Sequence, residues 1–390
     1  MSANRFRNFL TRSAVTTLTV ILLVINIIVA AATVIAAYGG IPDPTEHVIF
    51  ALMSMMLPGI LIAGLLTVVI DLFTRRWFAL IQAVAWLVSM PSLLVYSPLN
   101  IGSTKLTPEQ EEHSFTFLTY NVLHFWDFRG NVPGLERNAT IDYILSTDAD
   151  IVNLQEAESV KSWPLWHITS EQISELTERY PYRVINVNNQ QTVLSKFPFK
   201  FVDIPIPENC NVRMALFQLD IHGETVHLFN VHLESIGLSM ADKDLYAKLF
   251  DKAPASEAAL KREVREVKRQ LIDKLSVAFG KRAEQARFIR HTIDSIGGNF
   301  IVAGDFNDIQ GCYAIRTIMG EDMHDAYAEN AFGPTITYHG NRFYFRIDHV
   351  LYGGDLEAVD IERGNTPSSD HYPFLTKFVL LPPRQESDKY

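Results

Sequence analysis

The sequence predicts an α/β protein whose N-terminal part consists of membrane-spanning helices. Three observations lead to this prediction. Three long runs before residue 105 contain no charged residue, strand-like and helix-like segments alternate after residue 115, and polar side chains of a few types recur where the strands end. Together these observations indicate a membrane anchor, a sheet-based domain and a single site at one edge of the sheet structure.

Three uncharged runs near the N-terminus are each long enough to cross a bilayer. They are bounded by Arg12 and Asp43, by Glu46 and Asp71, and by Arg76 and Lys105. Each run exceeds the roughly 20 apolar residues that a helix needs to span the hydrocarbon core. We therefore predict an anchor at residues 1–97 with spans at about 14–38, 48–70 and 77–97. Pro58 and Gly59 interrupt the second span, which membrane helices tolerate.

The loop cations predict the orientation of the spans. Arg5, Arg7 and Arg12 precede the first span and Arg75 and Arg76 follow the second, whereas the loop between these spans holds no Lys or Arg. Cytoplasmic loops carry the excess of Lys and Arg, so the N-terminus is expected in the cytoplasm. Three crossings of the inner (plasma) membrane then place the rest of the chain outside the cytoplasm, in the periplasm.

Charge and cysteine content restrict the partners and the covalent structure. Five arginines and three acidic residues precede residue 98, so this part carries +2 and the remainder −12 of the net charge of −10. Proteins that bind duplex nucleic acid tightly usually show a basic face, so we expect no stable nucleic-acid complex. Cys210 and Cys312 are too few for a disulfide framework, and we predict no bond between them.

A polar linker at 98–114 separates the anchor from the domain predicted at 115–390. In this domain, apolar segments of strand length alternate with helical patterns. The predicted strands cover 115–120, 150–155, 193–194, 213–221, 225–231, 301–303, 346–352 and 374–380. The predicted helices cover 135–146 and 170–179, and a helical insertion runs from about 241 to 296.

The insertion is locally basic. Residues 241–290 hold thirteen Lys or Arg against eight Asp or Glu, and apolar residues recur there at helical spacing. One interpretation is an amphipathic helix that packs on the sheet and exposes its charged face to water. The other is a lid or membrane-facing helix that recruits anionic lipid or phosphate.

The stretch from Ile301 to Asp308 shows how one strand could deliver part of a site. The apolar residues end at Gly304, and Asp305 and Asn307 follow. Because these two residues lie two positions apart, their side chains point to the same side of an extended strand end. A plain turn is the alternative, since Gly-Asp and Asn-Asp are common turn dipeptides.

Other strands end in the same way. Eight polar positions lie at or beside strand ends: Asn121, Glu156, His232, Asp305, Asn307, Asp348, Asp370 and His371. One such residue usually just begins a loop, but eight of these types form a coherent set. Oxygen ligands suit Mg²⁺ or Mn²⁺, and no Cys/His spacing for zinc is present. Two histidines add acid and base chemistry, so the set suits the hydrolysis of a phosphate ester.

Six motifs in chain order resemble the endonuclease/exonuclease/phosphatase family, also called DNase I-like. They are Tyr120-Asn121-Val122, Leu154-Gln155-Glu156, Asn230-Val231-His232-Leu233, Gly304-Asp305-Phe306-Asn307-Asp308, Arg346-Ile347-Asp348-His349 and Ser369-Asp370-His371-Tyr372-Pro373. The resemblance spans about residues 115–380. It implies the fold of that family, a four-layer α/β/β/α sandwich with two packed sheets.

The resemblance also implies roles for the metal and water ligands. Glu156 with Asn121 would form a Mg²⁺ site, and Asp370 would be a further metal ligand or a supporting residue. Asp305 and Asn307 would orient the attacking water and the phosphate. In the abasic-site endonucleases of the family, an Asp occupies the position that is Leu123 in this sequence.

The histidines complete the expected site. The resemblance implies that His371, held by Asp348, is the base or a phosphate-binding imidazole. His232 would be the acid that protonates the leaving oxygen, and these two assignments could be exchanged. Arg213 and His339 are further candidates for substrate binding, with solvated surface residues as the alternative.

These features predict a membrane-anchored, Mg²⁺-dependent phosphoric ester hydrolase that acts outside the cytoplasm. Its substrate would be a phosphate ester, with lipid head groups as candidates, and it would be a phosphodiesterase or a phosphatase. An extracytoplasmic nuclease of the same family is the alternative. A catalytically inactive, membrane-bound binding protein is a third hypothesis, and it is disfavoured because none of the eight positions is replaced.

Overall fold

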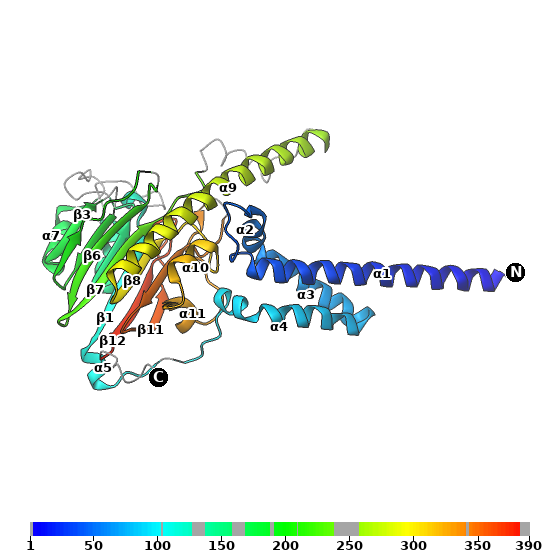
Figure 1. The fold of residues 1–390 in the computed structure, drawn as a ribbon, viewed down its shortest axis with the longest axis horizontal. Helices are drawn as coiled ribbons and strands as arrows, with labels where there is room; N and C mark the ends of the chain where they lie inside the picture. The colour runs from blue at the N-terminus through cyan, green and yellow to red at the C-terminus, as the bar shows by residue number, and fades with distance from the viewer. Residues whose placement is uncertain are drawn as a thin grey trace. The chain divides into compact units, whose positions relative to one another are not determined.

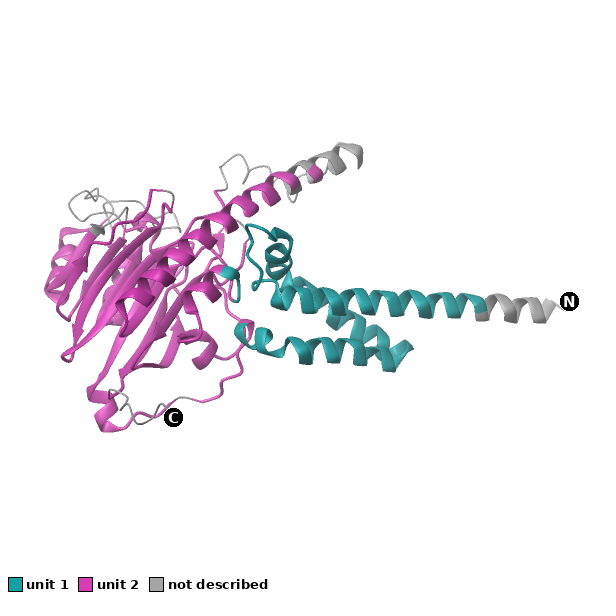
Figure 2. Cartoon of the chain, in the orientation of Figure 1, with its two compact units in different colours: residues 1–95, 311–313 teal, residues 96–310, 314–390 magenta. Residues whose placement is uncertain are grey.

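The structure is a computed structural model that describes residues 3–102, 104–126, 137–157, 168–187, 191–208, 210–237, 257–340 and 343–382. The course of the chain is shown in Figure 1. The chain divides into two compact units, residues 1–95 with 311–313 and residues 96–310 with 314–390 (Figure 2).

The first unit is built from helices. They are α1 (Ala3–Tyr38), α2 (Val48–Met55), α3 (Leu57–Thr74), the 3₁₀ turn η1 (Arg76–Phe78) and α4 (Ala79–Tyr96). Three segments are long and apolar enough to cross a membrane: Ser13–Tyr38, Leu57–Thr74 and Arg76–Tyr96. Large apolar side chains such as Ile28, Leu65 and Leu87 are exposed on them, as expected for helices that face lipid.

The second apolar segment differs from the predicted span at 48–70. The helix that begins at Val48 ends at Met55, and a new helix begins at Leu57 with Pro58 in its first turn. Proline has no backbone N–H and its ring clashes with the preceding helical turn, so it favours the start of a helix over its interior. The membrane-length segment is therefore shifted toward the C-terminus, to Leu57–Thr74.

A buried polar cluster joins the three long helices of this unit. Asn26 of α1 donates a hydrogen bond from Nδ2 to Asp71 Oδ1 of α3 at 3.1 Å. Gln82 of α4 donates from Nε2 to the Asn26 carbonyl oxygen at 3.0 Å. All three side chains are buried. Interhelical hydrogen bonds of this kind help membrane helices to associate.

The second unit contains two six-stranded sheets. The first has the strand order β11-β12-β1-β2-β4-β3 and the second β5-β6-β7-β8-β10-β9. The strands of the first sheet are β1 (Ser114–Asn121), β2 (Ile151–Gln155), β3 (Tyr182–Val187), β4 (Gln191–Ser195), β11 (Leu356–Arg363) and β12 (Phe374–Leu380). Those of the second are β5 (Phe199–Val202), β6 (Arg213–Ile221), β7 (Glu224–His232), β8 (Asn299–Asp305), β9 (Met323–Asp325) and β10 (Asp348–Gly353).

Helices cover the outer faces of the two sheets. Helices α6 (Ala139–Thr147) and α7 (Ser170–Arg179) pack on the first sheet through Ile141, Ile144 and Leu176. Figure 1 shows α9 (Glu257–Ile296) and α10 (Tyr313–Met319) beside the second sheet. The short elements are α5 (Pro108–Glu112), η2 (Leu123–Phe125) and α11 (Ala326–Asn330). This arrangement confirms the predicted four-layer α/β/β/α sandwich.

The alternation of side chains along β1 shows how the layers form. Phe115 and Phe117 point into the core between the sheets, whereas Leu118 and Tyr120 pack against the helices. The two-residue period of a strand separates these faces. Toward the C-terminal end of the strand the interior becomes polar, because Thr119 and Asn121 occupy the positions that continue the inward face.

Several boundaries differ from the prediction. The helix predicted at 135–146 begins at Ala139, because the Asn138 side chain accepts hydrogen bonds from the amides of Thr140 and Ile141 and caps it. The predicted linker contains α5. Strands β3, β5, β9 and β11 were not predicted from the sequence. Residues 135–136 of the predicted helix and 241–256 of the predicted insertion lie outside the described residues.

Candidate active site

The topology brings four predicted site residues to one edge of the sandwich. Each sheet contains one parallel strand pair, β1 with β2 and β7 with β8. Parallel strands end at the same edge of their sheet. Asn121 is the last residue of β1, Glu156 follows β2, and His232 and Asp305 are the last residues of β7 and β8.

Antiparallel neighbours bring three further residues to the same edge, because such strands begin where their partners end. Arg213 at the start of β6 pairs with His232, and Asp348 at the start of β10 pairs with Asp305. His371 lies just before β12, whose first residue pairs with Thr119 near the end of β1. Strand direction and register therefore place side chains that are far apart in sequence within one cluster.

Hydrogen bonds between the two sheets stabilise the interior next to this edge. Asn153 Nδ2 donates to the carbonyl oxygen of Ala303 at 3.1 Å. Gln155 Nε2 donates to Asn230 Oδ1 at 2.9 Å. All of these side chains are buried. Buried polar groups that find partners fix one arrangement of the interior, and here they fix the spacing of the strands that carry the cluster.

Asp305 lies at the centre of the cluster. Its Oδ2 atom accepts a hydrogen bond from Asn121 Nδ2 at 3.0 Å and lies 3.6 Å from His232 Nε2 and 3.7 Å from His371 Nε2. Asn121 Nδ2 also lies 3.3 Å from Glu156 Oε1, to which it donates. Glu156 and Asp305 thus present carboxylate oxygens to the amide nitrogen of Asn121. The Oδ1 atom of Asn121 accepts from the Leu123 amide at 3.2 Å.

The backbone after the strands is unusual. Glu156 and Asn307 adopt positive φ angles of 53° and 51°, a conformation that non-glycine residues seldom adopt. The Asn307 amide donates to Asp305 Oδ1 at 2.8 Å, and its side chain donates from Nδ2 to the Leu233 carbonyl oxygen at 3.0 Å. Gly304 has a φ of +143°, and a Cβ atom there would lie 2.1 Å from the Val231 carbonyl oxygen. Only glycine fits this approach of β8 to β7.

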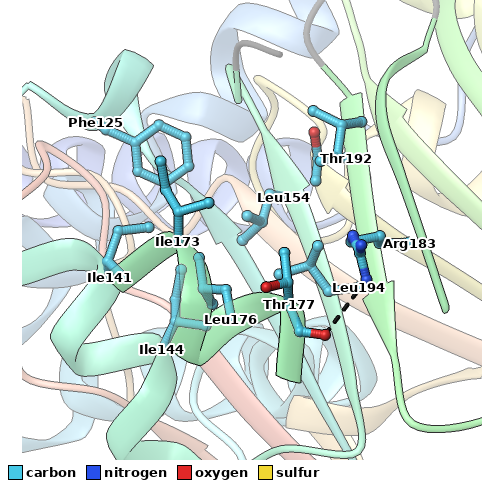
Figure 3. A pocket seen from close by; sticks show the side chains of 11 residues that line it. Phe125, Ile141, Ile144, Leu154, Ile173, Leu176, Thr177, Arg183, Thr192 and Leu194 are labelled. Atoms are coloured by element: carbon cyan, nitrogen blue, oxygen red, sulfur yellow. Dashed lines mark hydrogen bonds between the residues drawn. The ribbon is translucent and has the colours of Figure 1, made fainter. Parts of the chain in front are cut away.

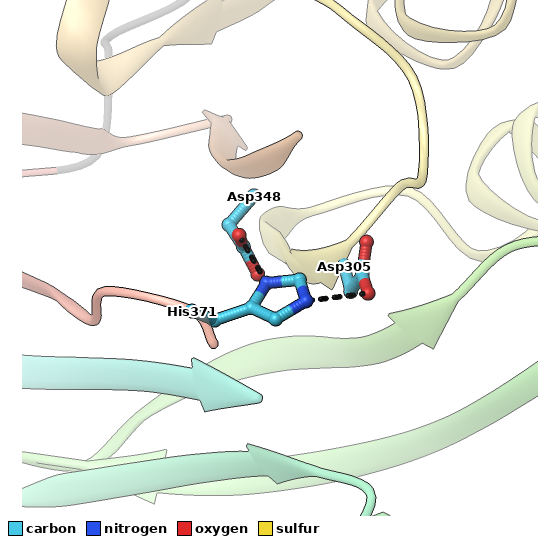
Figure 4. Close-up of side chains that lie close together, drawn as sticks. All are labelled: Asp305, Asp348 and His371. Carbon is cyan, nitrogen blue, oxygen red and sulfur yellow. Dashed lines mark hydrogen bonds and ion pairs between the residues drawn. The ribbon is translucent and has the colours of Figure 1, made fainter. Parts of the chain in front are cut away.

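His371, Asp348 and Asp305 form a line of buried groups (Figure 4). The Nδ1–H group of His371 donates to Asp348 Oδ2 at 2.8 Å, which leaves Nε2 facing Asp305. Burial alone would lower the pKa of His371, but the carboxylates of Asp348 and Asp305 raise it to about 10. The imidazole is therefore held in a fixed orientation and in its protonated form.

His232 occupies a different environment. Its Nε2 atom lies 3.3 Å from Arg213 Nη2 and 3.9 Å from Glu156 Oε1. Burial lowers the pKa of His232 well below its ordinary value, and the Arg213 guanidinium lowers it further. The cluster thus contains one imidazole favoured in the charged form and one favoured in the neutral form.

Two predicted residues lie beside the cluster. The His339 amide donates to the carbonyl oxygen of Asp370 at 3.0 Å, and the His339 ring packs on Tyr372. Among the described residues, no hydrogen bond or ion pair joins the Asp370 side chain to the other predicted site residues. Its carboxylate nevertheless helps to raise the pKa of His371, and its Oδ1 atom is buried without a hydrogen-bond partner among the described residues. Asp370 therefore lies beside the cluster without a bond to it.

His124 belongs to the cluster but was not predicted. Its Nε2 atom lies 3.5 Å from Glu156 Oε2, and its amide donates to the Glu156 carbonyl oxygen at 2.9 Å. It lies in η2, where Leu123, His124 and Phe125 have φ angles of 44°, 54° and 58°. In the sequence, the only indication that His124 belongs to the site is its position three residues after Asn121. No sequence pattern predicts the irregular backbone that turns its side chain toward Glu156.

The donor set fits a hard divalent cation. Asp305, Asp348 and His371 form a buried cluster whose ligand atoms lie within 4.8 Å of one another. Nδ1 of His371 is bound to Asp348, so Nε2 is the ring atom that faces the rest of the cluster. The raised pKa of the ring favours the protonated form, which has no lone pair for a metal. Burial raises the pKa of Asp305 to about 7, with His371 opposing the effect and Asp348 and Glu156 adding to it. A cation held by the carboxylates of Asp305 and Glu156 would relieve this crowding.

A separate cavity of about 230 Å³ lies between α6, α7 and the first sheet (Figure 3). Its lining includes Phe125, Ile141, Leu154, Ile173 and Leu176 and is mostly apolar. None of the predicted site residues lines it. The cavity is therefore distinct from the polar cluster.

The chain belongs to the endonuclease/exonuclease/phosphatase family. The model of this family matches residues 118–371, which include every residue of the polar cluster. A domain of unknown function matches residues 19–96, which make up most of the helical unit. Among curated proteins, none matches this chain.

Solved structures of the same kind of fold resemble this chain at low identity. The endonuclease/exonuclease/phosphatase from Beutenbergia cavernae DSM 12333 is 18% identical over 69% of this chain and 72% of its own, with a TM-score of 0.46. A humanised TDP2 from D. rerio is 14% identical over 68% and 99%, with a TM-score of 0.42. ANGEL2, described as a 2′,3′-cyclic phosphatase, is 14% identical over 72% and 99%, with a TM-score of 0.42. Similarity at this level carries no information about the substrate.

Proposed function

We propose that this protein is a membrane-anchored, divalent-metal-dependent phosphoric ester hydrolase. One observation carries the proposal: Asp305 contacts Asn121, His232 and His371 within 3.0–3.7 Å, although these residues come from four different strands or strand ends. Polar residues that only begin loops or turns have no reason to converge, whereas here a carboxylate, an amide and two imidazoles lie together. It supplies oxygen ligands together with proton donors and acceptors.

Glu156 and Asp305 are the residues whose carboxylates would hold the cation, with Asn121 supporting them and Mg²⁺ or Mn²⁺ as the expected metal. A bound divalent ion neutralises charge on phosphoryl oxygens and lowers the pKa of water. The protein's own part is to present the carboxylate oxygens of Glu156 and Asp305. Asn121 contributes by donating to both carboxylates, which keeps Glu156 and Asp305 at a fixed separation.

The remaining residues of the cluster would bind the phosphate and move protons. Asp348 accepts from Nδ1 of His371, so Nε2 is the atom that exchanges a proton or donates to a phosphoryl oxygen. His232, held between Arg213 and Asp305, is the second proton-transfer group. Asp305 would orient the attacking water, and Arg213 would contact the phosphate.

The proposal also includes a membrane anchor and a location for the catalytic domain. The three apolar helices would hold residues 1–97 in the inner membrane, with 98–114 as a linker and 115–390 as the catalytic domain. The distribution of arginines supports a cytoplasmic N-terminus and a periplasmic catalytic domain. An active site tethered to a bilayer has lipid head groups within reach, and this favours a phospholipid-type ester. A periplasmic nuclease is the second candidate.

A substrate panel tests the proposal. Purified protein in detergent would be incubated with sphingomyelin, phosphoinositides, single- and double-stranded DNA, and RNA, with Mg²⁺ or with EDTA. The proposal expects hydrolysis of at least one phosphoric ester that stops with EDTA and in His371→Ala. Hydrolysis of nucleic acid alone would select the nuclease. No hydrolysis of any ester would support a binding role instead.

A further inference from the structure

Helix α9 buries a charged side chain behind the candidate active site. Arg282 is only 1% exposed. Its Nε atom donates to Asp308 Oδ2 at 3.0 Å, and its Nη1 atom donates to the carbonyl oxygen of Glu234 at 2.9 Å. The guanidinium also lies over the Phe279 ring, 5.0 Å from its centroid.

The two partners of Arg282 belong to the two loops that carry the cluster. Glu234 lies two residues after His232, at the end of β7. Asp308 lies one residue after Asn307 and three after Asp305, at the end of β8. One guanidinium group therefore connects the loop of a proposed proton-transfer residue with the loop of the central carboxylate.

Gln285 continues the same contact one helical turn further along α9. Its Oε1 atom accepts from the Glu234 amide at 2.9 Å, and its Nε2 atom donates to the Asn211 carbonyl oxygen at 3.2 Å. Asn211 lies two residues before Arg213. Residues three apart lie on the same helix face, so this face of α9 binds three segments that lead into the site.

Asp308 is held from its other side as well. His349, which follows Asp348 in β10, donates from Nε2 to the Asp308 carbonyl oxygen at 3.0 Å. Direct bonds also join the loops to each other, since the Leu233 amide donates to the Asp305 carbonyl oxygen at 2.9 Å. Arg282 thus completes a network in which each loop contacts the helix and the other loop.

A structural role alone does not explain why this side chain is charged. A buried ion pair is costly to desolvate, and apolar residues of similar size often stabilise a fold equally well. What a guanidinium adds is directional bonding to two acceptors at once. We propose that Arg282, assisted by Gln285, is a positioning residue of the active site that fixes the spacing between His232 and Asp305.

This inference rests on the proposed function, and its test uses a matched control on the same helix. Arg290 of α9 is also largely buried and bonds Asp322 and the carbonyl oxygen of Ile318, away from the site loops. Arg282→Met and Arg290→Met would be compared with wild type in the hydrolysis of bis-p-nitrophenyl phosphate with Mg²⁺. Urea unfolding would be measured for each protein.

Arg282→Met is expected to lower kcat by about 10–100-fold with KM changed less than about threefold, as for other residues that orient active-site groups. Arg282→Lys keeps the charge but not the two-pronged geometry, so it should restore only part of kcat. Arg290→Met should lose stability and keep kcat within about twofold. Wild-type kcat in folded Arg282→Met, or an equal loss of kcat in Arg290→Met, would overturn the inference.

Hydrogen exchange separates failure of this inference from failure of the proposed function. The amides of Leu233 and Asn307 are bonded to Asp305 and report on the two loops. Arg282→Met should speed their exchange at least about tenfold, while Arg290→Met should not. Absence of turnover in wild type would refute the proposed function, and the exchange rates would still decide on the positioning role. Unchanged exchange in Arg282→Met and Arg282→Lys would refute that role.

Discussion

The Nδ1 atom of His371 lies 2.8 Å from Asp348 Oδ2, and both side chains are buried. The Asp348 backbone is held in place as well, because its amide donates to Thr337 Oγ1 at 3.0 Å. A carboxylate in this position sets the tautomer of the ring and aims the other nitrogen. Asp348 therefore determines the direction in which Nε2 of His371 points.

Replacing Asp348 by Asn tests this relationship. The amide can donate to Nδ1 and so favours the wrong tautomer of His371. We expect kcat to fall by about 10²–10⁴-fold with little change in KM, in line with the loss of an oriented acid or base. Steady-state kinetics on bis-p-nitrophenyl phosphate would measure the effect. A folded Asp348→Asn protein with kcat within twofold of wild type would be inconsistent with the assigned role.

Glu156→Gln tests the metal site. Loss of one anionic ligand should raise the Mg²⁺ concentration for half-maximal activity by at least about tenfold, with partial recovery at high Mg²⁺. Glu171→Gln is a suitable control, because Glu171 is an exposed carboxylate on α7 that pairs with Arg137. Metal titration of the two variants would show whether the effect belongs to Glu156. The same Mg²⁺ dependence in both would argue against Glu156 as a ligand.

The fold and most of the cluster could be predicted because strand ends are local features of a sequence. The alternation at Phe115, Phe117 and Leu118 and the motifs at Asn121 and Asp305 are visible without a structure. The contacts of Arg282 could not be predicted, because they depend on where a long helix crosses two distant loops.

Other parts escaped prediction for different physical reasons. His124 reaches Glu156 only through a backbone with positive φ angles, which its residue types do not signal. Asn26 is a polar residue inside the first apolar run, and the sequence alone does not show which residues it contacts. Its partners Asp71 and Gln82 lie 45 and 56 residues away along the chain, on two other helices, and no local pattern connects them.

Acid should destabilise the catalytic domain through His349 and Asp325. Burial and the Arg346 guanidinium lower the pKa of His349 to about 4. Burial would raise the pKa of Asp325, but Arg346 and His349 hold it below its usual value. Both folded-state pKa values lie below the unfolded ones, so the stabilisation is fully present above the unfolded pKa and is lost as pH falls.

For His349 the relevant window extends from about pH 6.5 to about pH 4. The free energy of unfolding should fall across it by up to about 3 kcal/mol from this residue. His349→Gln can still donate to Asp308 but does not titrate, so its stability should depend less on pH. Urea unfolding of the full chain in detergent at several pH values would measure both slopes. Equal slopes in wild type and His349→Gln would contradict the assignment.

Asn26→Leu tests the polar cluster in the helical unit. The substitution leaves Asp71 without its buried amide donor, so we expect the free energy of unfolding in mixed micelles to fall by about 1 kcal/mol. Thr74→Val is the control, because Thr74 is exposed and its Oγ1 atom donates to the carbonyl oxygen of Ile70 in the same helix. A loss in Asn26→Leu no larger than in Thr74→Val would show that the cluster does not join the helices.

The central claim is that the side chains around Asp305 form one metal-dependent site for phosphoric ester hydrolysis. Turnover of bis-p-nitrophenyl phosphate by purified wild type, with Mg²⁺ or Mn²⁺ and then with excess EDTA, tests it most directly when run beside His371→Ala. We predict turnover that requires the metal and falls by at least about 10²-fold in the variant. Metal-independent turnover, no turnover in wild type, or full turnover in folded His371→Ala would contradict the claim.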